Sequence, residues 1–386
     1  MFLTPICQVN VLLYGRGKMS YFLNLFKNTD KLLLFLPLCF AIISVVMIGS
    51  TAYDGAFVFN RDLKVQSAAF IIGFILIFVI LLIDYKIFQK YEKYIYIGSL
   101  LFLLTVYIPG LGVEHFGAKS WINLGVTDLQ PSELVKITFV LLFANYLSRN
   151  KDNLFTYKGV FFAALYGGPF IIIILKEDLG SAIVMSMMWI IMVFFAGVDY
   201  GIFAKLSAVF LICIPFLYRF MASHQKERID AFLHPGNLSL GGNYQVWNSK
   251  VAIGSGGFFG KGLFMGTQKE LKFLPVQKSD FIFSVIIEEL GMLGGIILIG
   301  LYTLFLYRII KIARTAKEFY GSLIAIGFIG MFGFQIFENI AMTMGLMPVT
   351  GITLPFISYG GSSVVANMIA LGLILNVGMR NKHINF

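Results

Sequence analysis

The chain has 386 residues, of which 58% are hydrophobic and 13% are charged, and its mean hydropathy is +0.83. These values exclude an ordinary soluble globular protein and predict a polytopic membrane protein. The net charge of +10 therefore reports first on membrane orientation, and no nucleic-acid partner is expected. Three cysteines without a pairing rhythm and four histidines without ligand spacing exclude a disulfide framework and a preformed zinc site.

Ten apolar runs are long enough to cross a bilayer as helices, which takes roughly 17–25 residues. Their centres lie near Phe40, Leu76, Leu101, Val140, Phe170, Met188, Val209, Ile297, Met331 and Ile369. The predicted fold class is an all-α polytopic membrane protein with one large extracytoplasmic loop between the seventh and eighth helices. The predicted segments are a cytoplasmic stretch 1–31, a ten-helix membrane domain 32–380 that includes the loop 219–280, and a cytoplasmic tail 381–386.

The distribution of lysine and arginine sets the predicted orientation. With a cytoplasmic N-terminus, 17 of the 30 basic residues fall in inside segments, and the short outside loops hold only Arg61, Lys64, Lys119 and Lys176. The positive-inside rule then places both termini in the cytoplasm. The opening stretch "MFLTPICQVNVLLYGRGK" lacks the order of a signal peptide, and Met19 is an alternative start. Residues 1–18 are therefore expected to be disordered or absent from the native protein.

The long loop 219–280 is basic and rich in glycine. Its eight basic residues face four acids, which suits either an anionic partner or a merely solvated loop. Closely spaced glycines let backbone amides approach a phosphate, so the loop could cradle a diphosphate, although a flexible loop is the alternative. The residues of this cradle would be Gly254, Gly256, Gly257, Gly260, Gly262 and Gly266 with Lys250, Lys261 and Lys269.

Several charged residues fall in or beside apolar runs, where an ionised side chain costs at least about 2.5–3.5 kcal/mol. Glu133 and Lys136 are three residues apart on one helical face, so they can form an ion pair that pins helices or serve catalysis directly. Asp178 begins the sixth span, where an acid also caps a helix.

Three more carboxylates belong to the stretch "SDFIFSVIIEELG". Asp280 could be an N-cap of the eighth span. Glu288 and Glu289 lie roughly 12–14 Å further along a helix, too deep for that role. We expect one of them to meet a cation or a polar network, and Lys136 to pair with Glu133, Glu288 or Glu289.

The motifs together resemble the SEDS family (shape, elongation, division and sporulation), the polytopic peptidoglycan polymerases that include RodA and FtsW. The resemblance covers residues 32–380, and its "AIGSGG" and "GTQ" forms are more similar to RodA, the elongation member. The motifs that carry it are "LQPSELVKI", "DLGSA", "ERIDAFLHP", "SKVAIGSGGFFGKGLFMGTQ", "LKFLP", "SDFIFSVIIEELG" and "MGLMPVTGITLPFISYGGSS".

The resemblance implies a glycosyltransferase that joins lipid II units at the outer face of the bacterial inner membrane and releases undecaprenyl diphosphate. It assigns catalysis to Asp280, as general base or as ligand of an activating cation, and a carboxylate suits removal of a hydroxyl proton. The diphosphate needs cations, which Arg228, the loop lysines or a divalent metal, Mg²⁺ or Mn²⁺, could supply. No organic cofactor is implied.

The chain departs from the family pattern before Trp121, at "KEDLG" in place of "QPDLG", where Asp178 is kept, and before Asp280. Ser120 stands in place of the arginine before Trp121, and Lys119 is its possible substitute. Val276 and Lys278 replace a glutamate and a histidine before Asp280, and Lys278 could hold a phosphate. Ser358 in "SYGG" could line the same cavity, or the motif could be a tight turn.

Two other function classes stay open. A lipid II flippase would need a polar route through both leaflets, whereas a polymerase needs its essential residues on one face. A scaffold for a partner is the third hypothesis. The resemblance implies a class B penicillin-binding protein as partner, together with other elongation-complex proteins, and we expect contacts through the eighth and ninth spans or the long loop.

Overall fold

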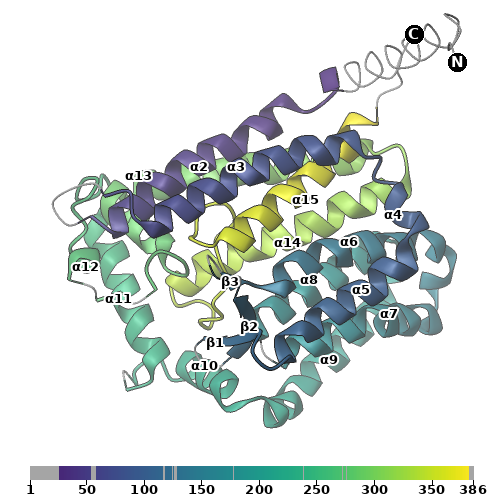
Figure 1. Ribbon diagram of the computed structural model, residues 1–386. Coiled ribbons are helices and arrows are strands. Elements are labelled where there is room, and N and C mark those ends of the chain that lie inside the picture. Colours follow the sequence, from purple (N-terminus) through teal and green to yellow (C-terminus); the bar gives the residue numbers. More distant parts are fainter. Residues whose placement is uncertain are drawn as a thin grey trace, which may run out of the picture.

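The computed structural model is a bundle of long helices with short helices and a small sheet at one end (Figure 1). Residues 1–18, expected to be disordered or absent, lie outside the described residues. The structure describes residues 26–53, 58–115, 118–123, 125, 128–176, 178–237, 239–271, 273–274 and 276–381.

Each of the ten predicted span centres falls in a separate helix. Six of the described helices, namely α2, α3, α7, α13, α14 and α15, are long and apolar enough to cross a membrane, and α8 and the first half of α9 are shorter apolar segments. The ten helices are α2 (Lys31–Thr51), α3 (Arg61–Leu82), α5 (Glu92–Leu104), α6 (Pro131–Arg149), α7 (Tyr157–Leu175), α8 (Leu179–Phe195), α9 (Tyr200–Phe220), α13 (Ile282–Thr315), α14 (Phe319–Thr343) and α15 (Gly361–Met379).

The C-terminal helices α14 and α15 form the middle of the bundle. In their apolar windows, 72% of α14 and 83% of α15 is buried, against 33% of α3 and of α7. The helix α15 packs on α3, and α14 packs on α13, α8 and α6. In Figure 1, α2 and α3 run along one side of this centre, and α5 to α9 lie on the other. The outer helices therefore expose apolar faces, as helices in lipid do.

Aromatic side chains fill the contact between α2, α13 and α14. The ring of Phe40 stacks on Tyr302 at 4.8 Å and on Phe356 at 5.7 Å between centroids, and Phe305 meets Phe332 edge to face at 5.1 Å. Stacked and edge-to-face pairs contribute about 0.5–1.5 kcal/mol each beyond the area that they bury. This cluster anchors the segment around Phe356, which leads into α15.

The prediction of a purely helical chain was wrong in one place. The connection from α5 to α6 carries a three-stranded antiparallel sheet of β1 (Gly112–His115), β2 (Ala118–Asn123) and β3 (Asp128–Leu129), in the order β1-β2-β3. In the register, Val113 lies opposite Trp121 and Ile122 opposite Leu129. The three strands pair with one another and so satisfy backbone hydrogen-bonding groups of this connection.

The long loop 219–280 is largely helical. It contains α10 (Ser223–Leu233), α11 (Gly241–Gly256) and α12 (Thr267–Glu270), which gather at the same end of the bundle as the sheet (Figure 1). The opposite end carries α4 (Ile87–Lys90) and the 3₁₀ turn η2 (Lys151–Phe155), while the other 3₁₀ turn, η1 (Thr105–Tyr107), leads into the sheet.

The helix α13 is broken one turn after Glu288. Gly291 has φ 72° and ψ −174°, which interrupts the helix and frees backbone groups on both sides. The loop after α11 satisfies them: Met292 N donates to Gly257 O at 2.9 Å, and Lys261 N donates to Glu288 O at 3.0 Å. The glycine-rich loop is thus docked on α13 along its backbone.

Candidate active site

Asp280 lies in the turn immediately before α13, at the end of the bundle that carries α10 to α12. Its backbone N–H donates to Val276 O at 3.2 Å, and its backbone carbonyl accepts from Asn339 Nδ2 at 3.0 Å. The predicted N-cap role is not seen, because Phe281 occupies the N-cap position and no side chain caps the helix. The half-buried carboxylate of Asp280 is therefore not used to cap α13.

Arg228 of α10 lies beside Asp280, and both flank Gly351 in the connection between α14 and α15. A methyl group at Gly351 would be 3.7 Å from Arg228 Nη1 and 3.7 Å from Asp280 Oδ2. Gly351 is exposed and has φ 79°, a conformation that favours glycine. An exposed glycine without a side chain thus lies next to both the cation and the carboxylate.

The Arg228 guanidinium is fixed by backbone rather than by a carboxylate. Its Nη1 donates to Thr350 O at 2.7 Å, and the described residues contain no ion pair between Arg228 and an acid. The positive charge of Arg228 is therefore not paired with a carboxylate, so the guanidinium can form charge-assisted hydrogen bonds with an anionic ligand.

The surroundings of Asp280 shift its titration. Burial raises the pKa of Asp280 from 3.8 to about 6, and the Asp178 carboxylate also raises it, whereas the Ser279 hydroxyl and Arg228 oppose the shift. A carboxylate with a pKa of about 6 is ionised at neutral pH and is a stronger base than an ordinary aspartate.

Asp178 caps α8, as its position in the sequence predicted. Its Oδ1 accepts from Ser181 N at 3.0 Å, and its Oδ2 accepts from Ser181 Oγ and Gln130 Nε2, both at 2.7 Å. The same helix end abuts the site, because a methyl group at Gly180 would be 2.8 Å from Thr350 O. Asp178 therefore lies at the border of the site, and its carboxylate caps α8.

Glu338 of α14 is a site residue that the sequence reasoning missed. Its side chain is 1% exposed, Thr350 Oγ1 donates a hydrogen bond to its Oε1, and its Oε2 has no hydrogen-bond partner in the part of the chain that the structure describes. The available signal was a single acid in the apolar run "GFQIFENIAM". Its connection to Asp280 and Arg228 is visible only in three dimensions.

Glu133 and Lys136 form a buried ion pair within α6. The Nζ to Oε1 distance is 2.8 Å, and the side chains are 2% and 8% exposed for Lys136 and Glu133. Of the three partners considered for Lys136, the structure selects Glu133. Pro131 occupies the first turn, as expected.

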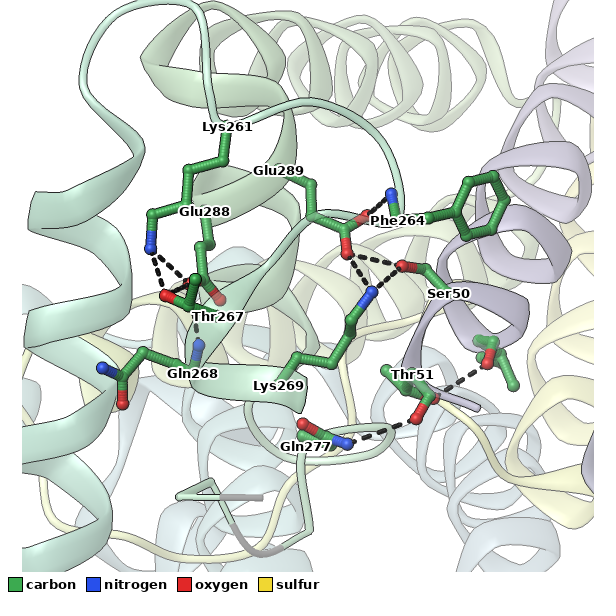
Figure 2. Close-up of polar contacts among 11 residues, drawn as sticks. Ser50, Thr51, Lys261, Phe264, Thr267, Gln268, Lys269, Gln277, Glu288 and Glu289 are labelled. Atoms are coloured by element: carbon green, nitrogen blue, oxygen red, sulfur yellow. Dashed lines mark hydrogen bonds and ion pairs between the residues drawn. The ribbon is translucent and has the colours of Figure 1, made fainter. Parts of the chain in front are cut away.

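Glu288 and Glu289 hold the long loop by pairing with Lys261 and Lys269 (Figure 2). These four residues are called the loop anchor. Glu289 Oε1 accepts from Lys269 Nζ at 2.7 Å and from Ser50 Oγ at 2.5 Å, and its Oε2 accepts from Phe264 N at 3.1 Å. Lysine from the loop, rather than Lys136, neutralises this acid. The expected meeting with a cation is therefore found, with a different cation.

Glu288 is held in the same way from the other side of α13. Its Oε1 accepts from Lys261 Nζ at 2.8 Å, from Thr267 Oγ1 at 3.2 Å and from Gln268 N at 2.9 Å. Figure 2 shows Lys261 paired with Glu288 and Lys269 paired with Glu289. Both ammonium groups are engaged by carboxylates, so binding a phosphate there would require these pairs to open.

Lys278 and Ser358 support the turn that carries Asp280. Lys278 Nζ is 2.5 Å from Asp62 Oδ2 and lies over the Tyr359 ring at 4.8 Å. Ser358 is buried, accepts from Leu354 N at 2.8 Å and donates to Ser279 O at 2.5 Å. The "SYGG" segment thus holds the backbone next to Asp280.

Lys119 and Lys250 lie at the edges of the site. Lys119 of β2 lines a small pocket with Asp178 and Ser120. Lys250 of α11 is exposed, and it lines a narrow groove together with Arg228, between α10, α11 and the connection after α14. Of the predicted cations, the structure brings Arg228 and Lys250 to one groove and places Lys261 and Lys269 in the loop anchor.

A divalent cation fits this site only in part. No three Asp, Glu, His or Cys side chains of the described residues lie close enough to hold a metal by themselves. Asp280 could contribute one carboxylate, and Mg²⁺ is commonly held by one or two carboxylates with substrate phosphates and waters. The donor set therefore suits a cation that arrives with a phosphorylated substrate.

The chain is similar to known proteins over most of its length. The family model described as "Cell cycle protein", which covers FtsW, RodA and SpoVE, matches residues 25–383. Stage V sporulation protein E of Bacillus subtilis (strain 168) is 36% identical over 92% of this chain and 98% of its own length. Peptidoglycan glycosyltransferase MrdB of Escherichia coli (strain K12) is 31% identical over 92% of this chain and 95% of its own.

Two solved structures share the fold. A chain from a peptidoglycan synthase complex that coordinates polymerization and crosslinking superposes with a TM-score of 0.78 and 30% identity, over 92% of this chain and 98% of that chain. The rod shape determining protein RodA of Thermus thermophilus has a TM-score of 0.66 and 30% identity, over 91% and 96%. The SEDS resemblance predicted from the motifs is confirmed, and the chain belongs to the FtsW, RodA and SpoVE family.

Proposed function

We propose that this protein is a peptidoglycan glycosyltransferase that polymerises lipid II into glycan strands during cell elongation and releases undecaprenyl diphosphate. The observation that carries the proposal is the placement of the Asp280 carboxylate and the Arg228 guanidinium on either side of Gly351. The names of the relatives supply the substrate class. The elongation role is supported by the RodA-like forms "AIGSGG" and "GTQ".

The chemistry assigned to Asp280 is removal of the acceptor hydroxyl proton. As the hydroxyl oxygen bonds to the anomeric carbon of the donor, the bond from that carbon to the diphosphate oxygen breaks, and the diphosphate leaves with the electron pair. Asp280 keeps the proton, and the positive charge of Arg228 stabilises the anionic leaving group. A pKa of about 6 suits the base, because Asp280 is ionised at neutral pH and still accepts a proton.

Two further cations have proposed tasks in this reaction. Lys250 shares a groove with Arg228 and is placed to meet a phosphate there. A Mg²⁺ or Mn²⁺ ion held between Asp280 and the diphosphate would supply further charge stabilisation. Asp280 would then act as its ligand.

The proposed topology has ten spans in a bacterial inner membrane. Both termini lie in the cytoplasm, and the long loop lies on the outer side. It is supported by the ten predicted centres, which fall in ten helices, and by the gathering of Asp280, Arg228 and α10 to α12 at one end of the bundle. A lipid-linked sugar of the outer leaflet would reach Asp280 at this end. Polar site residues confined to one end favour a polymerase over a flippase.

A class B penicillin-binding protein is the proposed partner, in company with other elongation proteins. The support is a structural neighbour from a complex that couples polymerization to crosslinking. We expect α13, α14 or the long loop to form the contact. Site-directed crosslinking from exposed positions such as Met265 and Phe337 should capture the partner, and capture only from α5 or α7 would overturn this assignment.

The decisive experiment measures polymerisation of labelled lipid II by the purified protein with its partner. Asp280→Asn should lower the rate by about 10²–10⁴-fold, the usual contribution of a general base. The matched control is Asp199→Asn, because Asp199 caps α9 by accepting from Ile202 N and asparagine preserves this bond.

Assays with and without chelator test the cation-ligand assignment of Asp280, because that assignment requires activity to depend on added Mg²⁺ or Mn²⁺. Full polymerisation by folded Asp280→Asn protein would remove Asp280 from the mechanism. Transport of lipid II without polymer formation by the wild type would favour the flippase.

A further inference from the structure

Glu338 is a buried carboxylate that the mechanism above leaves without a task. It lies in the last two turns of α14, and only one of its oxygens is engaged, by the hydroxyl of Thr350. A buried polar atom without a partner costs about 1–3 kcal/mol, and more for a charged group. An apolar side chain would fill the same volume without this penalty, so packing of the fold alone does not explain an acid at this position.

The contacts of Glu338 lead to the site in two steps. Its Oε1 fixes the Thr350 side chain, and the carbonyl of the same residue accepts from Arg228 Nη1 at 2.7 Å. Arg228 in turn lies next to Asp280 across Gly351. Glu338 is also within electrostatic reach of both Asp280 and Arg228.

Asn339, the next residue on α14, holds the backbone of Asp280. Asn339 Nδ2 donates to the backbone carbonyl of Asp280 at 3.0 Å and to Ile352 O at 2.7 Å. Glu338 and Asn339 therefore hold the connection between α14 and α15 on both sides of Gly351. One turn of α14 thus fixes the backbone of Asp280 and the acceptor of Arg228.

We propose that Glu338 is a positioning residue of the active site: it orients Thr350 so that the Thr350 carbonyl holds the Arg228 guanidinium beside Asp280. The inference rests on the proposed function, because it assigns Arg228 to the leaving diphosphate. Glu338 acts through Thr350 and does not itself touch the substrate.

Two substitutions of Glu338 separate its hydrogen bond from its acidic group. Glu338→Gln keeps an oxygen that accepts from Thr350 Oγ1 and removes the carboxyl group, whereas Glu338→Leu removes both. We expect Glu338→Gln to polymerise lipid II within about twofold of the wild-type rate. Glu338→Leu should lower kcat by about tenfold, the rate equivalent of one buried hydrogen bond.

The pH dependence of kcat gives a readout that a purely structural role would not move. Asp280 faces Arg228 from α10, Asp178 at the start of α8, Glu338 from α14 and Ser279 on its own turn. In Glu338→Leu, Arg228 is released and no longer favours the ionised Asp280, so the midpoint of the rate should move to higher pH. In Glu338→Gln the acceptor for the Thr350 hydroxyl is kept, so the midpoint should stay near that of the wild type.

Thr350→Val tests the link itself, because it removes the hydroxyl and keeps the carbonyl that Arg228 uses. If the link operates, the double variant Glu338→Leu with Thr350→Val is no slower than the slower single variant. The matched control is Gln335→Leu, a buried polar residue one turn earlier on α14, which should keep the wild-type pH midpoint.

Thermal unfolding of the purified proteins tests the same link without any activity. The shifts in melting temperature of Glu338→Leu and Thr350→Val should be less than additive in the double variant. If the wild type makes no polymer, the proposed function fails, while this cycle still decides whether Glu338 acts on Thr350. Additive shifts, or wild-type kcat and pH midpoint in folded Glu338→Leu protein, would overturn the inference.

Discussion

Asp280 lies eight residues before Glu288 and nine before Glu289 in the chain, and its environment in the structure is the opposite of theirs. Glu288 and Glu289 are fully buried, and each accepts hydrogen bonds from three donors of the loop or of α2. Asp280 is half-buried, lies next to the exposed Gly351 and has no ion pair among the residues that the structure describes.

The comparison separates carboxylates that hold the fold from one that is placed for chemistry. An acid surrounded by donors is fixed in place: both oxygens of Glu289 and Oε1 of Glu288 accept hydrogen bonds, so these oxygens are not available to a substrate. An acid that is desolvated without a direct counter-ion keeps its oxygens free and has a raised pKa, as Asp280 does. Satisfaction of hydrogen bonds, rather than charge or depth alone, distinguishes the two groups.

The largest effect on stability is expected in the loop anchor. Lys269→Met leaves Glu289 buried without its cation, so the free energy of unfolding should fall by about 3–5 kcal/mol. Thermal unfolding in detergent would measure the loss. Adding Glu289→Leu to Lys269→Met should restore much of the lost stability, because the unpaired charge disappears. A double variant as unstable as the single one would show that the pair does more than neutralise a buried charge.

The break of α13 should be the next most sensitive feature. Alanine at Gly291 would place its methyl group 2.3 Å from Gly260 N and from Phe258 O, both backbone atoms. The strained φ adds about 1–3 kcal/mol, so the docked loop should loosen and the melting temperature should fall. Gly300→Ala on the same helix is the control, because nothing lies within 4 Å of that methyl group. Equal stability of the two variants would contradict the docking geometry.

The activity should depend on pH through Asp280. The raised pKa of about 6 means that Asp280 is protonated and inactive below this pH, so the polymerisation rate should rise as pH increases through about 6. Below the midpoint the rate should fall about tenfold per pH unit. Thermal unfolding measured alongside separates this change from loss of fold. A rate that stays flat between pH 5 and 7 would argue against Asp280 as the base.

The smallest effect on stability is expected at Lys278. Its ion pair with Asp62 is partly exposed, with side chains 41% and 26% exposed, so Lys278→Met should change the free energy of unfolding by about 0–1 kcal/mol. If Lys278 meets a phosphate of the substrate, the same variant should raise KM several-fold while the melting temperature stays near that of the wild type. An unchanged KM would leave Lys278 with a supporting role only.

Local sequence patterns were sufficient for the features that depend on near neighbours. The ten span centres follow from apolar length, the cap formed by Asp178 from its place before a helix, and the Glu133 to Lys136 pair from a spacing of three. In each case the interacting groups belong to one helix or one turn. Their geometry is fixed by helix periodicity, which a sequence displays directly.

Contacts between distant segments could be decided only by the tertiary structure. Whether Glu289 meets Lys136 or Lys269 depends on how the loop folds back on α13, and the sequence pattern suggested only Lys136. Glu338 has no local sign of its task, because Thr350 lies beyond the end of α14 and Arg228 lies 122 residues from Thr350.

The sequence by itself determined that this is a helical membrane protein of one family, and which carboxylate to test first. The tertiary structure decided which charged groups neutralise one another and which stay free, because that depends on which backbones approach closely enough for a hydrogen bond. The glycines at 260, 291 and 351 permit those approaches: a methyl group on either of the first two would meet neighbouring backbone atoms within 2.1–2.3 Å, and Gly351 leaves the space between Arg228 and Asp280 open.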